Sequence, residues 1–356
     1  TIWLKENRFD IFSRTSKFIG IKEFIFHALF GKYIVDTGIA SATGMFNMHT
    51  RKWDKTILAF AGINKNHLSG LVSTHHIEFI NPGHLLAARL PMFSKTAFVT
   101  GGSDGGLANL GSGAMAQGSL AITVGTSAAA RMVTTKVYTD KQMKTFCYHL
   151  KNDFYIAGGA SNNGAIVLQW LKENILQNGE PMEQFFKQAA LIPPGCDDLL
   201  FLPYILGERA PVWNSNARGV FFGLSITHGK AHLVRAAMEA VIYNLYSIGK
   251  ILMERVPVTT IFANGGFANS PMWIQMLADM FNVTVFVNDI EESSAWGAVI
   301  VGLEAMGILP ETTPKTAGKK YEPCTGNHHK YIGCFEKFER VYGLVKSEFV
   351  NPAGLI

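Results

Sequence analysis

The chain has 356 residues, of which 48% are hydrophobic and 17% charged, and its formal net charge is +5. These values are typical of a globular protein large enough for two domains, and they exclude an intrinsically disordered chain. No apolar run reaches the roughly 18 residues of a membrane span and no Lys/Arg cluster follows one helix, so we expect neither a membrane nor a nucleic acid as partner.

Helices and strands alternate along most of the chain. In the first third we predict helices over residues 16–30 and 50–62, each closed by a glycine, and a strand over 95–100. Further strands are predicted over 120–124, 129–133, 260–264 and 283–287, and an apolar strand or loop over 199–206. Further helices are predicted over 163–174, 230–255, 270–282 and 294–306. This alternation predicts an α/β architecture.

Asp104 stands between two pairs of glycines, where the predicted strand over 95–100 gives way to a helix. Near a helix N-terminus the dipole favours negative charge, and a carboxylate on a flexible turn suits a general base for phosphoryl transfer to an alcohol. An ordinary N-cap aspartate is the alternative interpretation, and the local pattern favours neither.

A second glycine turn, Gly125-Thr126-Ser127, separates the two strands of a predicted hairpin. Successive N–H groups of a tight glycine turn form an anion-binding nest, and the two hydroxyls add donors. A plain hairpin turn is the alternative. The position of the turn, about twenty residues after Asp104, favours phosphate binding.

A third glycine turn, Gly265-Gly266, follows the predicted strand over 260–264. Ser270 is the expected N-cap of the next helix, with Pro271 at its first position. Two glycines at a strand end allow a phosphate or a nucleobase to approach, and the helix N-terminus adds its positive end. Glycines that serve packing alone are the alternative.

For two clusters, one of charged residues and one of potential metal ligands, we favour a structural role over a functional one. Glu208, Arg209 and Arg218 lie in one loop, where we favour an internal ion-pair network over a role in catalysis. The second cluster falls within eleven residues, but its spacing matches no common zinc site, so we expect a polar loop and no metal there: Cys324, His328, His329 and Cys334. The scattered cysteines favour reduced thiols and a cytoplasmic location.

Taken in order, the glycine-rich segments resemble the FGGY family of carbohydrate kinases. The matching segments are DTGIASATGMFNMHTRKWD (36–54), GGSDGGLANLGSG (101–113), TVGTSAAAR (123–131), LPYILGERAPVWNSNARGVFFGL (202–224), ANGGFANSPMWIQMLADMF (263–281) and ESSAWGAVIVG (292–302). The SDGxLxNLG pattern resembles gluconate kinases of this family, whereas xylulose and glycerol kinases usually carry Asn or Gln where this chain has Gly105.

The resemblance implies an actin-like, ribonuclease H-like α/β fold with two lobes. It places the end of a sugar-binding domain at residues 1–113 and a nucleotide-binding domain at 114–356. The implied activity is phosphorylation of a sugar or sugar acid by ATP with Mg²⁺, with D-gluconate converted to 6-phosphogluconate. Phosphorylation of xylulose, ribulose or glycerol is the alternative within the family, and the oligomeric state stays open, with a homodimer as one option.

The resemblance also implies a role for each site residue. Asp104 falls on the catalytic base, and Gly125, Thr126 and Ser127 fall on a phosphate hairpin. The remaining positions fall on the nucleotide side: Gly164 by the purine or ribose, Gly265 and Gly266 by the α-phosphate, Ser270 near the nucleotide and Gly297 where a helix passes the adenine.

One element of the family pattern has no counterpart in residues 1–110. Family members carry an early D-x-G-T hairpin, a first phosphate loop whose aspartate helps to hold Mg²⁺. We therefore expect an incomplete first lobe with only half of the phosphate clamp. A catalytically inactive nucleotide-binding fragment is the second hypothesis for the chain as given.

Overall fold

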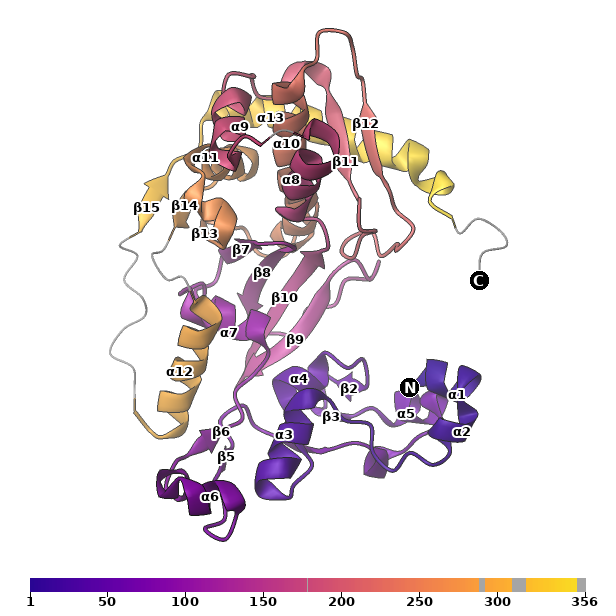
Figure 1. Ribbon diagram of the computed structural model, residues 1–356, viewed down its shortest axis with the longest axis vertical. Helices are drawn as coiled ribbons and strands as arrows, with labels where there is room; N and C mark the ends of the chain where they lie inside the picture. The colour runs from indigo at the N-terminus through magenta and orange to yellow at the C-terminus, as the bar shows by residue number, and fades with distance from the viewer. Residues whose placement is uncertain (178, 288–291, 309–317, 351–356) are drawn as a thin grey trace.

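The computed structural model describes residues 1–177, 179–287, 292–308 and 318–350. One large sheet and its helices form the upper part of the molecule in Figure 1, and the N-terminal elements form the lower part. Within the described residues, no helix is long and apolar enough to cross a membrane.

The large sheet has seven strands and mixed polarity. Its order is β15 (Lys319–Tyr321), β14 (Val285–Val287), β13 (Thr260–Asn264), β7 (Ser119–Val124), β8 (Ala128–Thr134), β10 (Phe154–Ser161) and β9 (Phe146–Lys151). Strand β13 runs parallel to β7 and to β14, and the other pairs are antiparallel. The chain turns after β7 and after β13 therefore lie at the same edge of the sheet.

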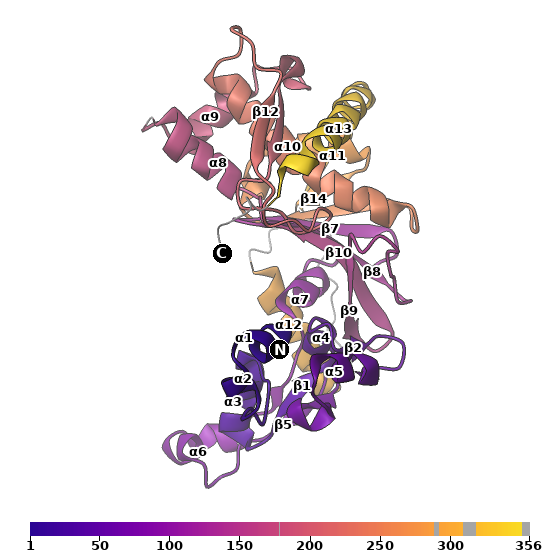
Figure 2. The same cartoon turned by 90° about the vertical axis from the view of Figure 1, so that its right-hand side faces the viewer.

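Helices cover both faces of this sheet (Figure 2). One face carries α8 (Ile166–Trp170, continued by a π-helix over Leu171–Leu176), α9 (Met182–Ala189), α10 (Lys230–Met253), α11 (Pro271–Phe281) and α13 (Thr325–Val345). The other face carries α7 (Asp104–Gly111) and α12 (Ser293–Ala305). A two-stranded ribbon, β11 (Leu200–Pro203) with β12 (Gly219–Phe222), rises among the first group of helices.

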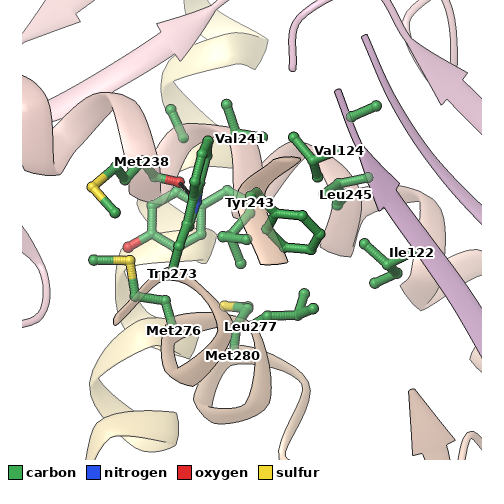
Figure 3. Close-up of a cluster of buried hydrophobic side chains, with 14 of the residues drawn as sticks. Ile122, Val124, Met238, Val241, Tyr243, Leu245, Trp273, Met276, Leu277 and Met280 are labelled. Atoms are coloured by element: carbon green, nitrogen blue, oxygen red, sulfur yellow. Dashed lines mark hydrogen bonds between the residues drawn. The ribbon is translucent and has the colours of Figure 1, made fainter. Parts of the chain in front are cut away.

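The main hydrophobic core lies between β7 and the helices α10 and α11 (Figure 3). Ile122 and Val124 project from the strand toward Tyr243 and Leu245 of α10. Trp273 is almost completely buried there, and its indole N–H donates to the carbonyl of Met238 at 3.1 Å. Burial of such large apolar side chains is the main stabilising contribution to this part of the fold, and it fixes the edge of the sheet that carries the glycine turns.

The N-terminal part consists of short elements joined by loops. Its helices are α1 (Ile2–Asn7), α2 (Phe9–Phe12), α3 (Ile21–Phe30), α4 (Thr37–Ser41), α5 (Lys55–Ala61) and α6 (Leu85–Arg89). Its strands form three pairs: β1 (Ile34–Asp36) with β4 (Gly70–Val72), β2 (Phe46–Asn47) with β3 (Lys52–Trp53), and β5 (Ile77–Glu78) with β6 (Phe98–Val99).

Most predicted elements are confirmed, with shifted ends. The hairpin and the strand over 260–264 are present, and Gly31 and Gly62 end α3 and α5 in the left-handed conformation. The two N-terminal helices are shorter than predicted. The second begins only after Asp54, whose carboxylate caps it, because the residues before it pair as β3.

The prediction of a polar loop around residues 324–334 is wrong. This segment begins α13, a helix of 21 residues that buries Tyr331, Phe335, Phe338 and Val341 along one face. That spacing is helical, and it places the four side chains against α10 and α11. The structure also contains no metal cluster here, since the described residues include no group of three or more His, Cys, Asp or Glu that could hold an ion.

Candidate functional site

Asp104 is the first residue of α7 and is exposed. The N-cap is Ser103, whose hydroxyl accepts from the Gly106 amide at 3.3 Å, so the alternative of an N-cap aspartate is wrong. One oxygen of Asp104 accepts from the Gly105 amide at 2.7 Å. The carboxylate thus lies exposed at the start of a helix, open to the hydroxyl that a general base must reach.

The turn Gly125–Ser127 joins β7 to β8 and lies against the start of α8. The amides of Ala165 and Ile166 donate to its carbonyl oxygens, at 2.8 Å to Gly125 and 3.3 Å to Thr126. The turn's carbonyls are thus occupied, whereas the exposed amides of Thr126 and Ser127 donate to no residue in the described part of the chain. Such free, adjacent N–H groups can bind an anion.

Gly164 lies directly beneath this turn. A Cβ atom on it would come within 2.5 Å of the Ser127 carbonyl oxygen and 2.6 Å of that of Gly125, so only glycine fits. Its amide donates to the Thr126 carbonyl at 3.1 Å. The structure therefore brings together four of the predicted site residues through backbone contacts alone.

Gly265 joins the same surface from the parallel strand β13. Its φ is +97°, and a Cβ atom would lie 2.5 Å from the carbonyl oxygen of Val124, the residue before the turn. A Cβ on Gly266 would meet no atom within 4 Å, so the space beside it is open. Ser270 is buried, and its hydroxyl accepts from the Trp273 amide at 3.4 Å as the predicted N-cap of α11.

Gly297 lies elsewhere, where α12 crosses α7. A Cβ on Gly297 would fall 1.9 Å from the Leu107 carbonyl oxygen, and one on Gly111 would fall 1.8 Å from that of Ser293. The two helices therefore touch backbone to backbone, which fixes the helix that carries Asp104. The position of Gly297 beside an adenine stays a prediction.

A buried network stabilises the loop that contains Gly164. Glu208 is only 2% exposed, and its carboxylate accepts from the side chains of Ser161, Asn163 and Asn244 at 2.7 to 3.0 Å. It also accepts from the Asn162 and Arg209 amides. Burial raises the pKa of Glu208, and these hydrogen bonds oppose the rise.

The predicted ion-pair network in this loop is therefore wrong. Glu208 is held by neutral donors, and Arg218 donates only to the carbonyls of Ser215 and Ala217. Arg209 donates to the Ser161 carbonyl at 3.0 Å. Hydrogen bonds to amides and hydroxyls satisfy a buried carboxylate without the cost of burying a second charge.

The N-terminal elements that contact the turn before Asp104 were not predicted from the sequence. Asp36 is completely buried, caps α4 and pairs with Lys22. Gly38 of α4 lies close to Gly102 and to the His149 carbonyl. His149 spans from β9 to α4 through a 2.8 Å contact between its Nδ1 and the Thr37 hydroxyl, and burial lowers its pKa.

A basic and aromatic group beside Asp104 was also missed. Arg131 of β8 and Asp104 interact electrostatically, and Arg131 also interacts with Tyr148 and Arg209. Burial lowers the pKa of Arg131, whereas the Asp104 carboxylate acts to raise it. The available signal was a single charged residue inside the buried strand AAARMV.

Comparisons with known proteins identify the family of this chain. Residues 120–306 match the C-terminal domain of the FGGY family of carbohydrate kinases, and residues 1–111 match its N-terminal domain. Gluconokinase of Bacillus subtilis (strain 168) is 44% identical over 318 residues, which are 86% of this chain and 62% of that protein. Xylulose kinase of the same organism is 28% identical over 96% of this chain and 69% of its own length.

Solved structures give the same result. The crystal structure of gluconate kinase from Lactobacillus acidophilus has a TM-score of 0.92 and 32% identity, covering 98% of this chain and 72% of that one. A ligand-bound xylulose kinase from Lactobacillus acidophilus has a TM-score of 0.91 at the same identity and coverage. This chain thus spans about 62% of the length of the gluconokinases that it matches. It has the two-domain, actin-like α/β fold, and it belongs to the FGGY family of carbohydrate kinases.

Proposed function

We propose that the protein transfers the γ-phosphoryl group of ATP to the primary hydroxyl of a sugar acid, converting D-gluconate to 6-phosphogluconate. The observation that carries the proposal is the continuous backbone surface at the ends of β7 and β13, with two free amides at Thr126 and Ser127. The identity of 44% to a gluconokinase supports the choice of gluconate.

In the proposed reaction, Asp104 takes the proton of the primary hydroxyl while the oxygen forms a bond to the γ-phosphorus. The bond from that phosphorus to the β-phosphate oxygen breaks, and ADP leaves. Thr126 and Ser127 hold the phosphates through their amides, and Gly265 and Gly266 leave room for the α-phosphate. Gly164, Ser270 and Gly297 are proposed to line the nucleoside side of the site.

We propose that Mg²⁺ binds as a complex with ATP. The described residues offer no group of three or more acidic, His or Cys side chains that could hold a metal ion. Mg²⁺ usually keeps several waters and is bound by one or two carboxylates together with nucleotide phosphates. We assign no protein ligand to it.

We also propose the domain boundaries, the cellular location and the oligomeric state of the protein. We assign residues 1–113 to the sugar-binding lobe and 114–356 to the nucleotide-binding lobe, a division that the family matches at 1–111 and 120–306 support. All four cysteines are free, which suits a cytoplasmic enzyme. A homodimer stays a prediction that light scattering can test.

The substitution Asp104→Asn tests the proposed activity. Loss of a general base lowers kcat by about 10²- to 10⁴-fold. The backbone surface at the ends of β7 and β13, which we call the phosphate surface, contains no atom of Asp104, so we expect its affinity for ATP to be unchanged. The measurements are steady-state ADP formation with D-gluconate and calorimetric binding of ATP. An unchanged kcat would refute the role of Asp104.

Two other functions predict different results in the same experiment. Equal or higher kcat/KM with xylulose, ribulose or glycerol would favour another kinase of the family, as the xylulose kinase relatives allow. Binding of ATP without turnover of any sugar would favour the inactive nucleotide-binding fragment.

A further inference from the structure

The side chain of Arg131 occupies a space that two glycines leave open. Arg131 pairs with Gly158 across strands β8 and β10, and a Cβ on Gly158 would lie 3.2 Å from the Arg131 Cγ. A Cβ on Gly105, next to Asp104, would lie 3.0 Å from Nε and 3.1 Å from Cζ and Nη2. Gly158 of the sheet thus leaves space for the aliphatic part of the Arg131 side chain, and Gly105 of helix α7 leaves space for its guanidinium.

The guanidinium of Arg131 forms no hydrogen bond and no ion pair with any of the described residues. The single hydrogen bond of this residue outside the sheet ladder is made by its backbone carbonyl, which accepts from the Asn109 side chain at 3.4 Å. Asp104 interacts with Arg131 electrostatically but forms no ion pair with it. A partly buried guanidinium with five N–H donors and no acceptor is costly unless a ligand completes it.

The electrostatic surroundings also favour an anion at this place. Arg209 is the second cation near Arg131, and the two repel each other. Tyr148 lies beside both of them. A bound oxyanion would accept hydrogen bonds from Arg131 and reduce the repulsion between the two arginines.

Two oxyanions could occupy the site, namely a carboxylate of the acceptor or the phosphoryl group in transfer. Arg131 lies three strand steps beyond Ala128, the first residue of β8, so its Cα atom is about 10 Å along the strand from the turn that contains Thr126. The free amides of the phosphate turn are therefore at one end of β8, whereas Arg131 lies farther along it, on the Asp104 side. This separation favours the acceptor.

We propose that Arg131 binds the carboxylate of the sugar acid and thereby selects acids over neutral sugars. The proposal rests on the proposed function, because it names the group that distinguishes gluconate from a neutral sugar. It gives Gly105 a role as well, since a Cβ atom at this position would lie 3.0–3.1 Å from the guanidinium and would push it by a few tenths of an ångström.

The experiment compares the whole protein with its Arg131→Met, Arg131→Lys and Gly105→Ala variants. Arg218→Met serves as the control, because Arg218 is exposed and donates only to two nearby carbonyls. Two quantities are measured for each protein. One is kcat/KM with D-gluconate and with D-xylulose, a neutral acceptor, and the other is the calorimetric Kd of D-gluconate and of the neutral alcohol D-glucitol.

We expect Arg131→Met to weaken kcat/KM and Kd for gluconate by about 10- to 100-fold, and to leave both values for the neutral compounds within about twofold. Arg131→Lys keeps the charge without the planar fork and should lose less. Gly105→Ala should weaken gluconate binding while the melting temperature holds or rises, because alanine favours the helix. That last variant separates recognition from folding.

Several results would overturn the proposal. A loss of kcat that is equal for gluconate and xylulose, with unchanged Kd for gluconate, would assign Arg131 to the phosphoryl group. A shift of the kcat–pH profile without a change in selectivity would make Arg131 a positioning residue for Asp104. If gluconate binds through Arg131 but is not phosphorylated, the proposed function fails and the carboxylate site stands; if gluconate does not bind at all, both fail.

Discussion

The phosphate surface and the region around Asp104 differ in the atoms that form them, which are main-chain atoms in the first and side-chain atoms in the second. At the ends of β7 and β13, the surface consists of backbone, and Gly164 and Gly265 are required because no Cβ atom fits beside the turn. Around Asp104, the groups that matter are side chains: a carboxylate, the Arg131 guanidinium and the Tyr148 ring. The first region depends on the absence of side chains and the second on their identity.

This difference teaches how each region should respond to mutation. Added atoms at the phosphate surface must displace backbone, so they should damage the fold and ATP binding together. Exchanged side chains near Asp104 should change chemistry or selectivity and leave the fold intact. Each region also has its own support, which is the Glu208 network for the first and the His149 contact with α4 for the second.

The largest effect on the fold is expected from Gly265→Ala. Alanine is strained at a φ of +97°, and its Cβ would meet the Val124 carbonyl oxygen at 2.5 Å. We expect a loss of at least about 2 kcal/mol in the free energy of unfolding and no detectable ATP binding. Urea unfolding and calorimetry measure the two quantities.

Gly302→Ala is the matched control for this prediction, because a Cβ at Gly302, in the helix α12, meets no atom within 4 Å. It should be neutral or stabilise by up to about 1 kcal/mol. Equal effects of the two alanine variants would contradict the requirement for bare backbone at Gly265.

A smaller effect is expected from Glu208→Gln. All the hydrogen-bond partners of Glu208 donate to it, so the amide NH₂ of glutamine would face donors in a buried site. The expected cost is about 1–3 kcal/mol in the free energy of unfolding. Glu183→Gln, which breaks an exposed pair with Lys187, should cost no more than about 0.5 kcal/mol. If the two variants were equally stable, the network would not support the loop.

The smallest effect concerns pH and the support of the Asp104 region. Burial lowers the pKa of His149 from its ordinary value of 6.5, so the unfolded chain binds the proton more tightly. The stabilising contribution is complete above pH 6.5 and is lost as the pH falls through the lower pKa of the folded state. Urea unfolding at several pH values should therefore show a steeper loss below pH 6.5 for the wild type than for His149→Gln. Parallel curves would contradict this role.

The sequence was most informative where local rules decide the structure. The strand over 260–264, the N-cap at Ser270 and the glycine ends of two helices follow from residue type and spacing. The helix α13 was missed although Tyr331, Phe335 and Phe338 repeat at helical spacing. Its polar residues and its cluster of Cys and His led to the prediction of a polar loop.

The parts of the site that could not be predicted depend on contacts between distant segments. Arg131 and Gly105 are 26 positions apart, and His149 meets Thr37 across 112 residues. Glu208 was recognised as a structural residue, but the number of neutral donors around it follows only from the packed loops. Such partners are set by tertiary structure, which local patterns do not contain.

The most direct test of the proposed phosphoryl transfer is ³¹P NMR of the product formed from ATP and D-gluconate. We predict a new phosphomonoester at the primary hydroxyl, C6, with ADP in equal amount, and almost none with Asp104→Asn. Inorganic phosphate as the only product, or a phosphoester at another carbon, would contradict the proposed transfer from the glycine surface to the hydroxyl that Asp104 deprotonates.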